Sequence, residues 1–136
     1  MTGNRAGLAV LAGGMAMGLG LVACAPPAPE VSGRALFAEN CAVCHGDGGR
    51  GDGPAAAGMT PPPVDLTRLS ADNDGVFPLV RVMSYVDGYT RPDDTMPEFG
   101  SLLVGPTVMV DTDDGVLTPT PAPLVALAEY LETLQR

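Results

Sequence analysis

The sequence contains no tryptophan and no lysine, only one histidine, and three residues each of phenylalanine, tyrosine and cysteine. Without lysine, and with a formal net charge of −9, the chain lacks the basic surface that nucleic-acid binding needs, so that class of function is excluded. A single histidine excludes any metal site that needs two imidazoles from this chain. The 136 residues suit one domain, and the shortage of aromatic side chains gives it a modest core.

What the sequence does contain is a C-x-x-C-H run, formed by Cys41, Cys44 and His45 and followed by Gly46. This run is the attachment signature of a c-type haem. Two thiols three positions apart near a helix end can each add to one vinyl group on the same haem edge. The next residue then lies beneath the iron, where its imidazole can serve as the proximal ligand. Because the only histidine occupies that position, the run predicts one covalently bound haem c.

Three other interpretations of this run fit the sequence less well. A thioredoxin-like dithiol belongs beside a βαβ pattern, and the chain shows no such alternation. A structural zinc site needs four ligands, whereas Cys41, Cys44 and His45 supply three. A disulfide between the two cysteines stays open as an alternative, but it leaves the adjoining histidine without a role.

The first 23 residues have the layout of a secretory signal peptide. Arg5 is the only charge before an apolar run over residues 8–23, which is shorter than the ~20 residues that span a bilayer. The run ends in Leu21-Val22-Ala23-Cys24, which resembles the lipobox of bacterial lipoproteins, where cleavage precedes a cysteine that is then acylated. The alternative is a soluble periplasmic protein that is cleaved elsewhere and keeps or loses Cys24 as a spare thiol.

These features predict a signal peptide at 1–23, a proline-rich tether at 24–31 and one haem domain at 32–136. The prolines make the tether a semi-rigid spacer. Acyl chains on Cys24 would hold the domain at the periplasmic side of a bacterial membrane. From Cys24 onward the chain has six arginines and sixteen acidic residues, so the net charge of the anchored part is more negative than that of the whole chain.

Apolar periodicity predicts that two helices, one near each end of the domain, pack together. Ser32 is placed as the N-cap of a first helix over 33–44. Its apolar stripe contains Gly33, Phe37, Cys41 and Cys44. The last helix is predicted over 124–135, where Tyr130 lies beside a leucine-rich stripe. We expect Tyr130 to pack against the glycine and the phenylalanine of the first helix.

The middle of the chain predicts less regular structure. Residues 46–63 are rich in glycine and proline, so they are expected to form a loop over one haem edge. A short helical turn is predicted over 64–69. A helix is predicted to follow Asp74 and to end at Asp87-Gly88, with Pro78 in its first turn.

A small β-hairpin is predicted before the last helix. Residues 107–110 and 116–118 are β-prone and flank the acidic turn 111–115. This turn is similar to a calcium loop but departs from its pattern at Gly115, so a solvated turn is the favoured interpretation.

Four methionines are candidates for the second axial ligand, namely Met59, Met83, Met96 and Met109. Met83 lies on the apolar stripe of the helix predicted after Asp74, where a core role is favoured. Met96 stands in an irregular T-M-P-x-F setting, where Pro97 restricts the backbone and helps to aim the sulfur. The sequence therefore predicts His45 and Met96 as the two iron ligands.

Together these features resemble a bacterial class I cytochrome c over residues 33–135. The resemblance rests on Cys41, Cys44, His45, Gly46, Pro54, Thr95-Met96-Pro97 and the two terminal helices. The family implies a small all-α fold of three to five helices around one covalent haem. It also implies that the backbone carbonyl of Pro54 accepts the Nδ1–H of His45, which would raise the basicity of the ring. The hairpin and the lack of lysine depart from the smallest members and from those that dock through a basic ring.

The resemblance implies an electron carrier rather than an enzyme, because filled axial positions leave the iron no open site. Methionine ligation raises the reduction potential relative to two histidines. The acidic surface predicts a monomer that docks on basic patches of a dehydrogenase, a quinol–cytochrome c reductase or a terminal oxidase. The alternative is a gas sensor or small haem enzyme with an open sixth position, although peroxidase chemistry usually needs a second histidine.

Overall fold

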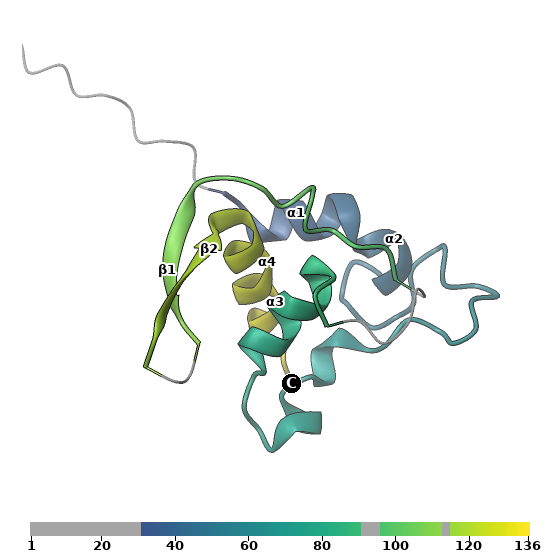
Figure 1. The fold of residues 1–136 in the computed structure, drawn as a ribbon. Coiled ribbons are helices and arrows are strands. Elements are labelled where there is room, and N and C mark those ends of the chain that lie inside the picture. The colour runs from purple at the N-terminus through teal and green to yellow at the C-terminus, as the bar shows by residue number, and fades with distance from the viewer. Residues whose placement is uncertain (1–30, 91–95, 113–114) are drawn as a thin grey trace, which may run out of the picture.

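The computed structural model describes residues 31–90, 96–112 and 115–136. The predicted signal peptide at 1–23, the tether up to residue 30 and the acylation site Cys24 lie outside the described residues. In chain order the elements are α1 (Gly33–Asn40), α2 (Ala42–His45), the 3-10 turns η1 (Leu66–Arg68) and η2 (Ala71–Asn73), α3 (Leu79–Asp87), β1 (Thr107–Asp111), β2 (Leu117–Pro121) and α4 (Ala122–Thr133) (Figure 1). None of the described helices is long and apolar enough to cross a membrane.

The first helix begins where it was predicted, because the Ser32 side chain accepts a hydrogen bond from Ala35 N at 3.3 Å. The prediction of one continuous helix over 33–44 is wrong. The backbone of Cys41, with φ −115°, ends α1 and starts α2. The interruption is local, since His45 N still bonds to Cys41 O at 2.9 Å.

The contact between α1 and α4 confirms the predicted packing of the terminal helices. The rings of Phe37 and Tyr130 lie 5.5 Å apart with an interplanar angle of 52°. A Cβ atom at Gly33 would overlap the backbone carbonyl of Ala126 and lie 2.9 Å from Tyr130 Cβ. Glycine therefore lets the two helices approach until their backbones touch.

Gly33→Ala is expected to destabilise the haem-loaded protein by about 2 kcal/mol. Alanine gains about 1 kcal/mol of helix propensity over glycine, but overpacking here costs about 3 kcal/mol, the upper end of its usual range, because a backbone carbonyl cannot rotate away. Gly48→Ala is the matched control, because the nearest atom to a Cβ there is 3.9 Å away. Urea unfolding checks both variants, and equal midpoints would refute the close approach of α1 and α4.

The helix predicted to follow Asp74 directly begins later, at Leu79. The chain leaves η2 through Asp74 and Gly75, which have φ values of 55° and 85°, and this left-handed pair cannot continue into a helix. Pro78 therefore precedes α3 instead of lying in its first turn. The end of α3 is as predicted, since Gly88, with φ 98°, caps it and donates its N–H to Ser84 O.

The predicted hairpin is confirmed. Strands β1 and β2 pair antiparallel, with Thr107 opposite Pro121 and Asp111 opposite Leu117. Strand β2 runs directly into α4, which starts and ends two residues earlier than predicted. The described residues form four α-helices and this one small sheet, which is compatible with the predicted helical fold that carries a hairpin before its last helix.

The core lies among the four α-helices, with one contribution from the segment before β1. Phe37 and Leu127 are its most deeply buried large side chains. Within the described residues the core consists of Phe37, Cys41, Ala42, Val82, Met83, Val86, Leu103, Leu124, Val125, Leu127, Ala128 and Leu131. Met83 is therefore a core residue, as predicted. In Figure 1 the hairpin lies to the left of these helices and the long segment between α2 and η1 to the right.

Candidate functional site

A cavity of about 430 Å³ lies beside this core. Its volume falls within the range of roughly 300–1,000 Å³ that is usual for cofactor pockets. Most of its lining is apolar: Phe37, Met59, Pro61, Pro62, Pro63, Val64, Leu66, Leu69, Val82, Val86, Pro97, Leu127 and Leu131. The remaining lining side chains carry the polar or metal-binding groups: Cys41, Cys44, His45, Arg81, Tyr85 and Met96.

The three motif residues all reach this cavity from the junction of α1 and α2. Cys41 and His45 are buried and Cys44 is half-buried, and both cysteines are free thiols. Burial, and to a lesser extent the neighbouring Cys44, raises the pKa of Cys41 to about 11. Cys41 is therefore a neutral thiol at neutral pH, in contrast to the thiolate of a reactive redox cysteine.

The other interpretations of the motif find no support in the described part of the chain. There, no group of three or more His, Cys, Asp or Glu side chains is arranged to hold a metal ion. A zinc site would need a fourth ligand beside Cys41, Cys44 and His45. A disulfide would need the two cysteines bonded, and they are not.

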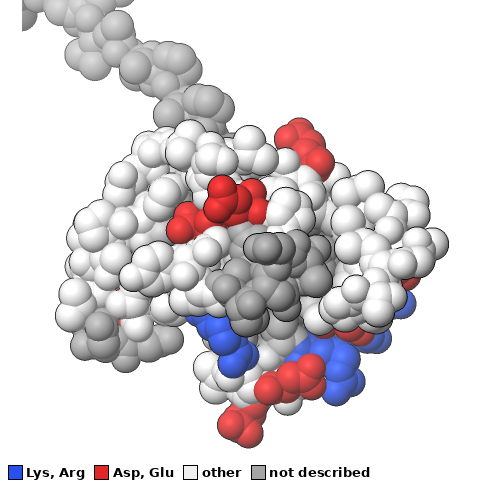
Figure 2. Space-filling model, turned by 45° about the vertical axis from the view of Figure 1, so that its right-hand side comes forward, with Lys and Arg blue, Asp and Glu red and all other residues white. Residues whose placement is uncertain are grey.

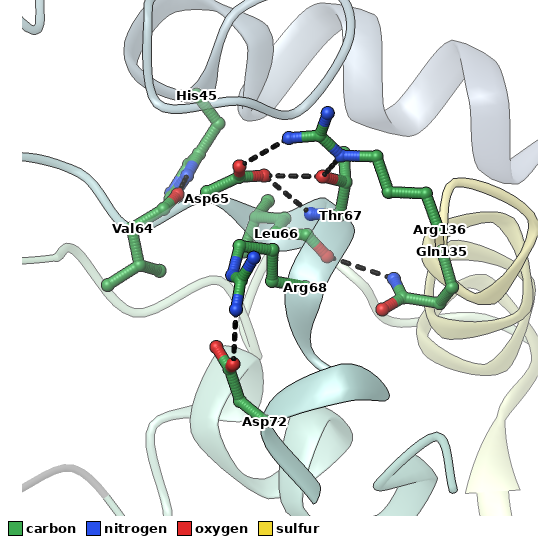
Figure 3. Close-up of polar contacts among 9 residues, drawn as sticks. All are labelled: His45, Val64, Asp65, Leu66, Thr67, Arg68, Asp72, Gln135 and Arg136. Carbon is green, nitrogen blue, oxygen red and sulfur yellow. Dashed lines mark hydrogen bonds and ion pairs between the residues drawn. The ribbon is translucent and has the colours of Figure 1, made fainter. Parts of the chain in front are cut away.

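The ring of His45 is oriented by the backbone carbonyl of Val64, which lies 3.1 Å from Nδ1 (Figure 3). When Nδ1–H donates this bond, the neutral ring keeps its Nε2 lone pair for a metal. Burial lowers the pKa of His45, while the bond to Val64 acts in the opposite direction. The imidazole is thus held in the neutral form that binds iron.

The acceptor predicted for this bond, the carbonyl of Pro54, is wrong. The backbone beside Pro54 pairs with α2, for instance through Ala55 N to Val43 O at 2.9 Å, and Pro54 is exposed outside the cavity. The loop returns through prolines 61–63 and brings Val64 to the histidine instead. One signal in the sequence could have indicated this, namely that Val64 lies between a proline run and Asp65, the N-cap of η1.

Two of the four candidate methionines line the cavity, and they are Met59 and Met96. Met83 is buried in the core and is absent from the lining. Met109 is 57% exposed on β1. Met96 is partly buried against the core cluster, whereas Thr95 of its motif lies outside the described residues.

Sequence analysis missed Arg81 and Tyr85, which line the cavity one helical turn apart on α3. Arg81 Nη2 donates to Asn73 Oδ1 at 3.3 Å. Among the described lining residues Arg81 is the one arginine, so it is placed to neutralise an acidic group of a bound cofactor. An arginine on the flank of an amphipathic helix is typical of a solvated surface, which is why the sequence alone did not indicate it.

A mainly apolar cavity that joins two thiols, a neutral imidazole and a thioether suits a covalently attached haem. The fold and the site thus define a small, mainly helical haem protein. Comparison with protein families agrees: residues 31–78 match the family model of cytochrome c. Members of that family bind a c-type haem covalently through cysteines, and Cys41 and Cys44 lie within the matched segment. Comparisons with curated proteins and with solved structures gave no match.

Proposed function

We propose that the protein is a one-electron carrier in which His45 and Met96 fill both axial positions of a haem attached to Cys41 and Cys44. The observation that carries this proposal is that all four side chains line one cavity, although Met96 lies far from the motif in sequence. The haem supplies an iron that alternates between two oxidation states.

Residues of the chain set the reduction potential of this iron and shield its ligands from water. Val64 orients the His45 imidazole and raises its basicity. The apolar walls from α1, α3 and α4 keep water from the ligands and disfavour added charge at the site. With two protein ligands, the site holds no position for a substrate or a gas.

This proposal predicts a reversible one-electron wave in voltammetry and no uptake of carbon monoxide by the reduced protein. The reason is that both axial positions are occupied by side chains that move little between oxidation states. Optical titration of the reduced protein with carbon monoxide is the direct check. Ready binding by the wild type would reveal an open sixth position and favour the gas sensor or small haem enzyme.

The partners proposed for this monomer are redox proteins with basic docking surfaces, such as a reductase, a dehydrogenase or an oxidase. The chain carries sixteen acidic residues against seven arginines, and Figure 2 shows acidic side chains on the upper part of one face and again beside the arginines below. A lipid on Cys24 at the periplasmic side of the membrane would keep carrier and partner close. We expect the rate of electron transfer to a basic partner to fall as salt is added, and a rate independent of salt would contradict this docking mode.

A further inference from the structure

Gln135 and Arg136, which follow α4, form hydrogen bonds with residues 65–70, far from them in sequence (Figure 3). We call these two residues the α4 latch. Gln135 Nε2 donates to Leu66 O at 2.9 Å, and Gln135 Oε1 accepts from Ser70 N at 2.9 Å. The side chain of Gln135 thus holds both ends of the short segment that contains η1.

Arg136 holds the start of the same segment. Its Nη2 donates to Asp65 Oδ2 at 2.9 Å, and its Nε donates to Thr67 Oγ1 at 2.6 Å. Its backbone N–H also donates to Thr67 O at 3.2 Å. Thr67 is only 3% exposed, so these bonds tie Arg136 to a fixed point of the fold.

The segment held by the latch begins directly after Val64, whose carbonyl faces His45. Asp65 carries the peptide nitrogen that follows this carbonyl, and its Oδ1 accepts from Thr67 N at 3.0 Å and Thr67 Oγ1 at 2.6 Å. The carboxylate of Asp65 is therefore fixed from both sides, by Thr67 and by Arg136. A shift of Asp65 would turn the Val64 peptide plane and move its oxygen away from Nδ1.

We propose that Gln135 and Arg136 are positioning residues for the proximal iron ligand: they hold the Val64 carbonyl against His45 Nδ1. The inference rests on the proposed function, in which His45 binds the iron. It connects α4, which forms a wall of the cavity, to the electronic character of the imidazole. A ring that donates a strong Nδ1–H bond is more basic and favours the oxidised iron.

The test compares Gln135→Ala, Arg136→Gln and the double variant with wild type, all in the haem-loaded full chain. Two quantities are measured: the exchange rate of the His45 Nδ1 proton by NMR, and the reduction potential. We expect exchange to be about tenfold faster in the double variant, and the potential to rise by the equivalent of about a threefold shift in the redox equilibrium. Thermal melting confirms that each variant is folded.

Arg68→Gln is the matched control, because it removes the same charge from η1 without touching the latch. The side chain of Arg68 forms an ion pair with Asp72 at 3.1 Å, and both side chains are exposed. Loss of a positive charge by itself favours the oxidised iron and lowers the potential, opposite to the effect expected for Arg136→Gln. If Arg68→Gln and Arg136→Gln change the reduction potential equally, Gln135 and Arg136 do not position the Val64 carbonyl. An unchanged exchange rate of the His45 Nδ1 proton in the double variant would overturn the proposal as well.

The ferric optical spectrum of the same wild-type sample separates this failure from failure of the proposed function. If the red sulfur–iron band is present and exchange is unchanged, only the latch is refuted. If the band is absent in wild type, the proposed ligation fails, and the latch falls with it.

Discussion

Replacing Cys41 and Cys44 together by alanine is expected to leave the chain unfolded under conditions in which the wild type melts cooperatively. Both thiols line the cavity, and without them no haem is held covalently to fill it. Counted as an enclosed void at ~24 cal/mol per Å³, the cavity of about 430 Å³ corresponds to a cost of at most about 10 kcal/mol, since part of the cavity opens to solvent. That equals the whole free energy of unfolding of a typical domain, about 5–15 kcal/mol. The chain has no tryptophan that could collapse into the space.

Circular dichroism with urea titration measures this outcome. Val43→Ala is the matched control, because Val43 lies between the two cysteines and is 52% exposed. That variant should attach haem and unfold cooperatively near the wild-type midpoint. A haem-free double variant that also unfolds cooperatively would show that the polypeptide core suffices on its own.

Met96→Ala is expected to lower the reduction potential by the equivalent of more than a tenfold shift in the redox equilibrium, about 59 mV for one electron. The thioether favours the reduced iron, and its removal opens the sixth position. The reduced variant should therefore bind carbon monoxide, whereas the reduced wild type should not. Voltammetry and gas titration measure the two effects.

Met59→Ala is the control for this variant, since Met59 is the other methionine that lines the cavity. It should keep a potential close to that of the wild type and remain closed to carbon monoxide. If reduced Met59→Ala binds carbon monoxide and reduced Met96→Ala does not, the ligand has been assigned to the wrong methionine.

Much of the fold could be predicted from local pattern. Ser32, the stripe through Gly33 and Phe37, and Tyr130 sit at helical spacings, and their contacts follow from that spacing. The hairpin followed from β-prone residues on either side of an acidic turn. The start of α3 could not be predicted, because the apolar pattern continues through Val76 while the backbone there turns at Asp74.

The site was predictable where it depends on sequence spacing and not where it depends on the path of a loop. The order of Cys41, Cys44 and His45 dictates their chemistry directly. The acceptor for His45 depends on how residues 46–63 fold back, and that path brings Val64 rather than Pro54 to the ring. Arg81 and the α4 latch depend on contacts between segments far apart in the chain, which no local pattern records.

Whether His45 and Met96 both bind the iron is decided by the optical spectrum of the ferric protein. The weak red band of a sulfur–iron bond should be present in wild type and in Met59→Ala, and lost in Met96→Ala. Absence of that band from the wild type, or its survival in Met96→Ala, would contradict the assignment.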